Sequence, residues 1–224
     1  MNSANSDNVR RVAIVGAGLI GSGWAAHFLA RGLEVVATDP ATGAEEALRR
    51  QVDRIWPMVA GLGLQPGADR ARLTFSVNLE AAVAGADFVQ ESGPERLELK
   101  AALFARIDAA APPNVILASS SSGLKMTDIQ AGCAHPERCV IGHPFNPPYL
   151  VPLVEVVGGR RTTEEAVERA MKIYAGLGKH PIRLRREFPG HVANRLQAAL
   201  WREALHLVAE GVVSVADVDA AVCE

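Results

Sequence analysis

The feature that most constrains this chain is a set of three closely spaced glycines between two apolar segments near the N-terminus. Residues 11–15 are apolar enough for a buried strand, and Gly16, Gly18 and Gly21 follow at once in G-x-G-x-x-G spacing. An apolar helical pattern then runs over residues 19–30, with Trp24, Phe28 and Leu29 on its inner side. A strand, a glycine turn and a helix in this order predict a βαβ unit that binds a dinucleotide.

Each glycine has a separate physical reason in such a unit. Gly16 permits the sharp turn from strand to helix, Gly18 lets the backbone approach a pyrophosphate, and Gly21 lets the helix pack closely on the strand. The helix N-terminus offers free N–H groups and a partial positive charge to the phosphates. The sequence therefore predicts cofactor contacts at Gly16, Ala17, Gly18, Leu19, Ile20 and Gly21.

An acidic residue after the second strand indicates which dinucleotide binds. Gly32 ends the helix, and the apolar strand 34–38 leads to Asp39, eighteen residues beyond Gly21. A carboxylate at that position accepts hydrogen bonds from both ribose hydroxyls and repels a 2′-phosphate. No Arg follows within the next few positions, so the expected cofactor is NAD in preference to NADP.

Composition excludes several classes of protein. With 224 residues the chain has room for one to two domains with a real core. A net charge of −2 gives no support for a nucleic acid or an anionic membrane as partner, and no apolar run reaches membrane-spanning length. The three cysteines, Cys133, Cys139 and Cys223, have no metal or redox spacing. We expect buried or semi-buried free thiols, no metal, a flexible N-terminal tail in place of a signal peptide, and a cytoplasmic location.

Strand and helix patterns alternate through the first two-thirds of the chain. This alternation predicts an α/β, Rossmann-type doubly wound and mostly parallel sheet over residues 1–188, followed by the first helices of an all-helical C-terminal domain over 189–224. The expected strands are 11–15, 34–38, 73–76, 87–90, 115–118, 139–142, 153–157 and 182–184. The expected helices are 19–30, 41–60 (bent or ended by Pro57), 79–83, 95–110, 127–131, 164–177, 191–210 and 215–222.

Polar residues at strand ends are the candidates for chemistry. The serine run 119–122 follows the fifth strand and is either part of the cofactor crevice or a solvated turn. His143 ends the sixth strand, and Glu155 lies on the next strand, twelve residues further on. Adjacent packing of these strands would set the carboxylate against the imidazole and make His143 a general base, although a lone His is more often structural. Asn194 is either an ordinary residue near a helix start or a donor aimed into the cleft.

Five segments carry a resemblance to a known family: VAIVGAGLIGSGWA, QESGPERLELK, ASSSSGLKMTDI, HPERCVIGHPFNPPYLVPLVEVVGG and GHVANRLQAALWREALHLV. The chain resembles the 3-hydroxyacyl-CoA dehydrogenase superfamily over nearly its whole length. The resemblance implies that His143 is the base, that Glu155 orients it, and that Ser122 and Asn194 hydrogen-bond the reacting oxygen. It also implies cofactor contacts from Glu95, Lys100 and Asn146. Without the resemblance, Glu95 and Lys100 would be interpreted as surface charges on a helix.

Two departures from the family pattern matter. His191 stands where the family has a Phe. The family also continues beyond the point where this sequence stops, with a helical domain that completes the substrate cleft and the dimer interface. We therefore expect a fragment or shortened form that binds NAD, turns over substrate poorly and self-associates through Leu196, Leu200, Leu207 and Val208. A homodimer is expected for the full-length family.

Substrate choice within the superfamily is argued from the segments around the site. The arginines between residues 44 and 72 form a short, interrupted set, which is interpreted mainly as a solvated face and not as a grip for CoA phosphates. The chain resembles the L-carnitine and L-gulonate dehydrogenase branch in three segments: Trp56-Pro57, GPERLELK and ALWREALHLV. This resemblance favours a small 3-hydroxy acid as substrate. Phe145, Tyr149 and Trp201 are candidates to face a quaternary ammonium, or are core aromatics. L-gulonate, a 3-hydroxyacyl-CoA, and a non-catalytic, crystallin-like NAD-binding role stay open as alternatives.

Overall fold

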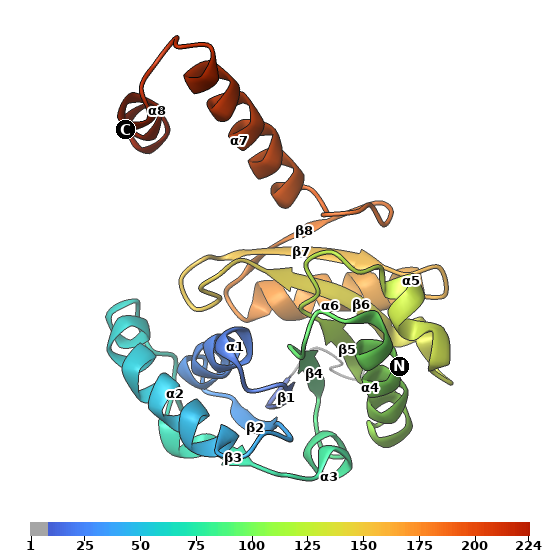
Figure 1. Ribbon diagram of the computed structural model, residues 1–224. Coiled ribbons are helices and arrows are strands. Elements are labelled where there is room, and N and C mark those ends of the chain that lie inside the picture. The colour runs from blue at the N-terminus through green and yellow to red at the C-terminus, as the bar shows by residue number, and fades with distance from the viewer. Residues whose placement is uncertain (1–8) are drawn as a thin grey trace. The chain divides into compact units, whose positions relative to one another are not determined.

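The computed structural model describes residues 9–224, and the expected N-terminal tail lies almost entirely outside the described residues. The chain divides into two compact units, Met1–Pro189 and Gly190–Glu224. The first unit is an eight-stranded sheet with helices on both faces, and the second is a pair of helices (Figure 1). This is the predicted α/β class with a helical C-terminal segment.

The sheet has the strand order β3-β2-β1-β4-β5-β6-β7-β8. Neighbouring strands run parallel except β6 and β7, which pair antiparallel. The chain order reverses between β1 and β4, and ligands in open α/β sheets bind beyond the carboxyl ends of the strands at such a switch point. The strands are β1 (Arg11–Val15), β2 (Glu34–Thr38), β3 (Leu73–Phe75), β4 (Phe88–Glu91), β5 (Ile116–Ser119), β6 (Cys139–Pro144), β7 (Leu153–Gly158) and β8 (His180–Arg183).

Two apolar clusters fill the two faces of the sheet. One cluster packs α1 (Leu19–Ala30), α2 (Ala44–Gly61) and α6 (Glu164–Gly176) on the strands. The other packs α3 (Leu79–Val83), α4 (Leu97–Ala110) and α5 (Met126–Ile129) on the opposite side. Because both faces are covered, the inner strands β1, β2 and β5 are continuously apolar over most of their length and do not alternate, as expected for a parallel sheet.

Helix α1 is buried on all sides over its last three turns. Trp24, Phe28 and Leu29 are each 0 % exposed, as predicted for the inner side of this helix. The indole of Trp24 stacks on the Phe28 ring at a centroid distance of 5.1 Å. Burying side chains of this size contributes roughly 1.5–3 kcal/mol each, so α1 is anchored firmly behind the glycine turn.

Several expected boundaries were wrong, for reasons that lie outside the local sequence. Helix α2 begins at Ala44 and not at Ala41, because the amide of Ala41 donates to Asp39 in the preceding turn. Pro57 lies inside the helix and does not end it, because α2 continues to Gly61. A proline inside a helix costs about 3 kcal/mol, and burial of the stripe Leu48, Val52, Ile55 and Val59 outweighs that cost.

Helix α4 begins at Leu97, so Glu95 precedes the helix where the sequence predicted its first residue. Strand β4 extends one residue further than expected and ends on Glu91. Each of these shifts moves a carboxylate to the end of the sheet where the cofactor crevice was predicted.

The second unit consists of α7 (Ala193–Ala209) and α8 (Val215–Cys223). Ser214 caps α8 by accepting a hydrogen bond from the amide of Asp217. Cys133 and Cys139 are buried as expected, but Cys223 is exposed, which corrects the expectation of a buried or semi-buried thiol. In the part of the chain that the structure describes, no helix is long and apolar enough to span a bilayer.

Candidate active site

The glycine turn joins β1 to α1 and shows a different constraint at each glycine. Gly16 has φ +97°, and a Cβ there would lie 2.7 Å from the backbone carbon of Ser92. A Cβ on Gly21 would lie 1.9 Å from the carbonyl oxygen of Gly16. A Cβ on Gly18 would meet nothing within 4 Å. The protein's own packing thus explains two glycines, whereas Gly18 borders open space that a closely approaching ligand would use.

The start of α1 suits an anion. Gly18 is the N-cap residue, no side chain caps the helix, and the first turn carries no acid. The first-turn amides of such a helix have no intrahelical acceptors, and they carry the positive end of the helix dipole. Gly18 and Leu19 are exposed, so these donors lie at the surface where a pyrophosphate would bind.

Asp39 follows β2 and is held against the glycine turn. The amide of Ala17 donates to its Oδ2 at 2.8 Å, and the amide of Ala41 donates to its Oδ1 at 2.9 Å. A carboxylate offers about four acceptor positions, so each oxygen keeps one for a ribose hydroxyl. The Ala17 amide, predicted to face the cofactor, is instead used to orient this carboxylate. These residues fit a dinucleotide with a free 2′-hydroxyl.

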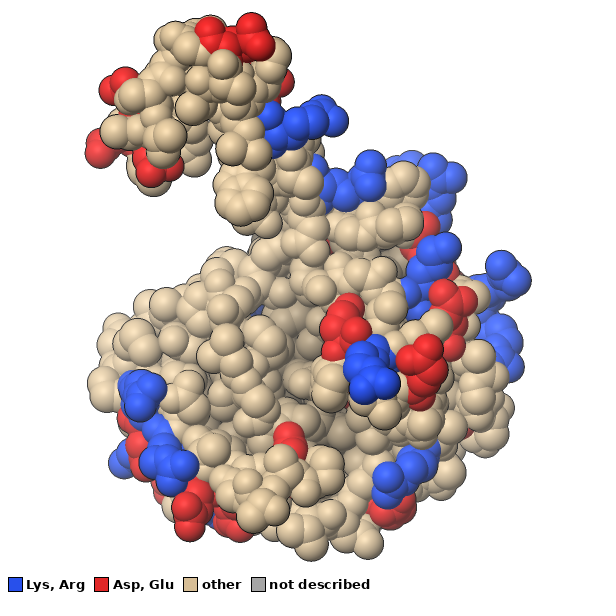
Figure 2. Space-filling view, in the orientation of Figure 1, with Lys and Arg blue, Asp and Glu red and all other residues tan. Residues whose placement is uncertain are grey.

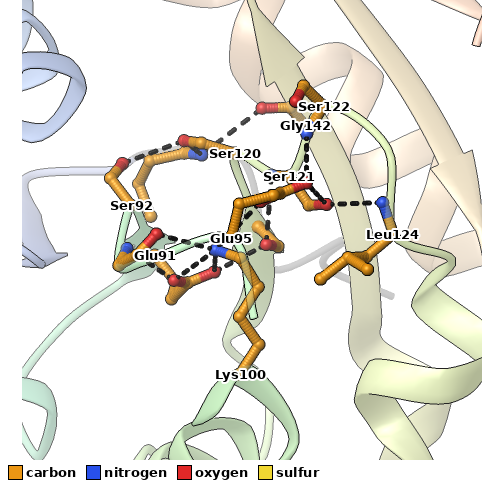
Figure 3. A network of polar contacts seen from close by, with 12 residues as sticks. Glu91, Ser92, Glu95, Lys100, Ser120, Ser121, Ser122, Leu124 and Gly142 are labelled. Atoms are coloured by element: carbon orange, nitrogen blue, oxygen red, sulfur yellow. Dashed lines mark hydrogen bonds and ion pairs between the residues drawn. The ribbon is translucent and has the colours of Figure 1, made fainter. Parts of the chain in front are cut away.

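A buried ion pair lies where β4 ends. Lys100 of α4 is 1 % exposed and Glu91 is 0 % exposed, and the Lys100 Nζ lies 2.7 Å and 3.0 Å from the two carboxylate oxygens of Glu91 (Figure 3). Glu91 also accepts hydrogen bonds from the Gly93 amide and the Ser119 hydroxyl. Lys100 is therefore not the surface charge that the sequence would suggest without the family resemblance. Its ammonium donates to Glu91 and to the Gly93 carbonyl, so it braces the ends of β4 and β5 from within.

Glu95 connects this ion pair to the serine loop. Its Oε1 accepts hydrogen bonds from the Ser121 hydroxyl at 2.6 Å and from the amides of Ser122 and Gly123 at 3.0 Å each, and Lys100 lies 3.7 Å from its other oxygen (Figure 3). Burial alone would raise the pKa of Glu95, but the Ser121 hydrogen bond and the Lys100 charge outweigh it, so the pKa lies below its ordinary value. An ionised Glu95 therefore fixes the backbone of the loop that carries Ser122.

The serine run is neither a fully solvated turn nor a row of hydroxyls facing a crevice. Ser119 is buried against Glu91, and the Ser120 hydroxyl accepts hydrogen bonds from Gln90 and from the indole N–H of Trp24. Ser121 donates to Glu95, as described above. Ser122 alone among the four is exposed. Three serines thus build the loop, and Ser122 is the one at the surface.

His143 and Glu155 are cross-strand partners in the antiparallel pair β6–β7. The Nδ1 of His143 lies 2.8 Å from the Oε2 of Glu155, and the two residues are 6 % and 0 % exposed. An ionised carboxylate can only accept a hydrogen bond, so the contact with Glu155 assigns a proton to Nδ1 of His143. The antiparallel return between the strands therefore produces the contact that the twelve-residue spacing suggested.

The segment after His143 carries three further candidates. The Phe145 ring lies 4.9 Å from the His143 ring, and Asn146 is exposed. Tyr149 packs partly against the core cluster beside α1, which favours its interpretation as a core aromatic. Asn194 and Trp201 belong to the second unit, where Trp201 is 73 % exposed.

Sequence reasoning missed Glu91, although a signal was present. An acid ends the fully buried strand FVQE, and a lysine follows nine residues later on the next helix. Charged residues are almost never fully buried unless they are paired, so an acid inside a buried strand predicts a partner of this kind. Among residues 9–224, no group of three or more His, Cys, Asp or Glu side chains could hold a metal ion.

Comparison with known proteins agrees with this geometry. Residues 11–188 match the NAD-binding domain of 3-hydroxyacyl-CoA dehydrogenase, and residues 190–224 match the C-terminal domain of the same enzyme. An L-carnitine dehydrogenase of Streptomyces coelicolor is 60 % identical over 97 % of this chain and 69 % of its own length. An L-carnitine dehydrogenase of Pseudomonas aeruginosa is 55 % identical over 96 % of this chain and 67 % of its own length.

Solved structures give the same result. A 5-formyl-3-hydroxy-2-methylpyridine 4-carboxylic acid 5-dehydrogenase, described as an NAD-dependent dismutase, matches with a TM-score of 0.87 and 37 % identity, over 96 % of this chain and 70 % of that one. The 3-hydroxybutyryl-CoA dehydrogenase of Escherichia coli K12 matches with a TM-score of 0.84 and 33 % identity, over 92 % and 44 %. The chain, with its NAD-binding Rossmann domain, therefore belongs to the 3-hydroxyacyl-CoA dehydrogenase family.

Proposed function

We propose that this protein oxidises the hydroxyl group of a small L-3-hydroxy acid with NAD, using His143 as general base. The hydrogen bond between His143 Nδ1 and Glu155 carries this proposal, because it leaves Nε2 as the acceptor of a substrate proton. A histidine held by a buried carboxylate is a common general base near neutral pH. The chain spans about two thirds of the length of its curated relatives, so the proposal concerns the full-length protein.

The residues divide the reaction as follows. His143 Nε2 takes the proton of the substrate hydroxyl, and Glu155 stabilises the resulting imidazolium. Ser122 donates a hydrogen bond to the oxygen as it becomes a carbonyl. NAD would supply the acceptor for the hydride that leaves the carbon bearing this oxygen. Asp39 would hold its adenosine ribose, the start of α1 would hold its phosphates, and Glu95 and Asn146 would contact its nicotinamide half, with Lys100 supporting Glu95.

The proposed substrate is L-carnitine, which is oxidised to 3-dehydrocarnitine. Relatives at 54–60 % identity are L-carnitine dehydrogenases. The arginines near α2 also argue against CoA phosphates as ligands. Arg49 and Arg50 pair with Glu45 and Glu46, and blue and red side chains intermingle over α2, at the left of Figure 1 (Figure 2). Phe145 is the proposed aromatic face for the quaternary ammonium.

A turnover assay of the full-length protein tests this proposal. NADH formation is followed at equal concentrations of L-carnitine, L-gulonate and L-3-hydroxybutyryl-CoA. We expect the highest kcat/KM with L-carnitine. A preference for L-gulonate or the acyl-CoA would overturn the substrate, and NADH binding without turnover of any 3-hydroxy acid would favour a non-catalytic, crystallin-like role.

Asp39 should determine the choice of cofactor. Asp39→Ala is expected to weaken NADH binding about 10- to 100-fold, because hydrogen bonds to a charged group contribute roughly 1.5–3 kcal/mol. Discrimination against NADPH should relax at the same time, since the repulsion of the 2′-phosphate is lost. Fluorescence titration with NADH and NADPH measures both effects. Asp53→Ala, at another partly exposed acid, is the control, and tighter binding of NADPH than NADH by the unmodified chain would contradict the assignment.

The second unit is proposed as an association surface that forms a homodimer. Of the four residues expected to drive association, Leu196 and Leu200 are more than half exposed, whereas Leu207 and Val208 are partly buried. Trp201 and Leu205 of α7 are more than half exposed as well. Burying such side chains is worth roughly 1.5–3 kcal/mol each, and patches of this kind mark interfaces. Light scattering should show self-association of the 224-residue chain, and Leu205→Glu should reduce it. A clean monomer at all concentrations would refute this proposal.

We also propose a cytoplasmic location and no nucleic-acid or membrane partner. The three free thiols suit a reducing compartment, and the net charge of −2 offers little attraction for polyanions. Cell fractionation tests the location directly, and recovery of the protein with membranes or in a secreted fraction would contradict it.

A further inference from the structure

Lys179 is a buried lysine that has no part in the chemistry described above. It lies in the turn between α6 and β8 and is 7 % exposed. Its Nζ donates hydrogen bonds to the carbonyl of Pro148 and, at 3.1 Å, to the carbonyl of Val151. The same nitrogen lies 5.0 Å from the centre of the Trp24 ring on α1. One ammonium group thus connects three elements that are far apart in the sequence.

The surroundings of Lys179 make its burial costly. The ion pairs found among residues 9–224 do not include Lys179. The charged or titratable groups that act on it are Arg31 at the end of α1 and His27 within α1. Burial, followed by the charge of Arg31, lowers the pKa of Lys179 to about 7. Burial, followed by the Lys179 charge, lowers the pKa of His27 to about 3, so His27 adds no further positive charge at neutral pH.

A lysine that only filled space would be replaceable by methionine at lower cost. A buried ammonium without a carboxylate partner loses hydration that carbonyl oxygens and an indole face restore only in part. We therefore infer that the two hydrogen bonds donated by Lys179 have a structural role. Both acceptors, Pro148 and Val151, lie in one loop.

That loop, residues 145–152, joins the two strands that carry the His143–Glu155 pair. Phe145 and Asn146, proposed above for substrate and cofactor contact, lie on it. The loop folds back on itself, because the amides of Leu150 and Val151 both donate to the Pro147 carbonyl at 3.0 Å. It also approaches α1 closely: a Cβ on Gly23 would lie 2.9 Å from the Pro148 ring.

We propose that Lys179 is a positioning residue that clamps the 145–152 loop onto α1, and so fixes Phe145 and Asn146 relative to the glycine turn. The inference rests on the proposed function for what the loop contacts. Helix α1 is the reference element, because its N-cap Gly18 lies in the turn proposed to hold the dinucleotide phosphates. The Trp24 ring that faces Lys179 also donates its indole N–H to Ser120, at the end of β5. The clamp therefore links the loop, through α1, to the end of β5.

The decisive variant is Lys179→Met, which keeps the length of the side chain and removes its donors. Lys172→Met, at an exposed lysine on α6, is the matched control. Hydrogen exchange at the Leu150 and Val151 amides reports the loop directly and needs no turnover. NADH titration and separate values of kcat and KM report the site, and thermal unfolding reports global stability.

For Lys179→Met we expect exchange at these two amides to accelerate about 10-fold or more, because local opening controls exchange. The kcat/KM should fall roughly 10- to 100-fold, mainly through higher KM for NAD and for the hydroxy acid, as expected for displaced contact groups. Thermal unfolding should stay close to that of the unmodified protein. Lys172→Met should behave like the unmodified protein in every measurement.

Unchanged loop exchange and unchanged KM in a folded Lys179→Met would overturn the clamp. If this variant does not fold, Lys179→Arg decides the matter, because it keeps a cation with donors. Slow loop exchange in Lys179→Arg supports the clamp, and fast exchange in a folded Lys179→Arg contradicts it. If the unmodified protein turns over no 3-hydroxy acid but Lys179→Met still loosens the loop, the proposed function fails and the clamp stands.

Discussion

Replacing His143 by alanine should lower kcat for 3-hydroxy acid oxidation by about 10²–10⁴-fold, the usual contribution of a positioned general base. The loss should appear in kcat because the proton is taken only as the carbonyl forms. NADH binding should change little, since His143 contributes to proton transfer and not to the phosphate or ribose contacts.

Glu155→Gln tests the other member of the pair. An amide can donate to Nδ1, which moves the imidazole proton to Nε2 and removes the base, so a loss of about 10²–10⁴-fold in kcat is expected here as well. His135→Ala, at an exposed histidine beside Glu137, is the control and should leave kcat unchanged. All assays use the full-length chain. Near-normal turnover by a folded His143→Ala would remove His143 from the base role.

Breaking the buried Glu91–Lys100 pair should have the largest effect on stability. Glu91→Gln leaves the Lys100 ammonium buried without its full countercharge, and removal of one partner from a buried pair costs about 3–5 kcal/mol. Glu95, 3.7 Å from Lys100, limits the loss because it can take over part of the ion pair. Urea unfolding measures the change in the free energy of unfolding.

The double variant Glu91→Gln/Lys100→Met tests whether the two charges stabilise the fold through their interaction with each other. Removing both charges should restore much of the stability lost in Glu91→Gln, so the two substitutions should be strongly non-additive. Glu45→Gln breaks an exposed pair with Arg49 and should cost under about 1 kcal/mol. NADH binding should weaken in Glu91→Gln, since Glu91 also orders Gly93 and Ser119 beside the glycine turn. A stability loss as small as that of Glu45→Gln would show that the pair is unimportant.

Many elements of the fold could be predicted because their signals are local. The strands carry continuous apolar runs, and the turn after β1 needs Gly16 and Gly21 whatever the rest of the chain does. The boundaries were less predictable where a side chain from another element decides them. Helix α4 starts late because Glu95 binds the serine loop, and α2 starts late because Asp39 holds Ala41.

The candidate site shows the same division. Sequence spacing alone suggested that Glu155 approaches His143, and the antiparallel register of β6 and β7 makes them direct partners. It also identified Asp39 through its distance from the glycines. Without the family resemblance, the sequence would suggest that Lys100 is a surface charge, because a lysine on a helix is normally solvated. The Lys100 ammonium can be buried because Glu91 on β4 and the Gly93 carbonyl in the following turn accept its hydrogen bonds, which offsets its lost hydration.

The sequence by itself determined the sheet, the glycine turn and the preference for NAD, because these depend on periodicity and on residues close together in the chain. The tertiary structure alone decided which polar side chains are buried and what they support. Glu91 holds Lys100, Glu95 fixes the serine loop, and Lys179 reaches the loop after His143. The physical reason is that a charge can be buried only where partners from distant segments converge, and that convergence exists only in the folded chain.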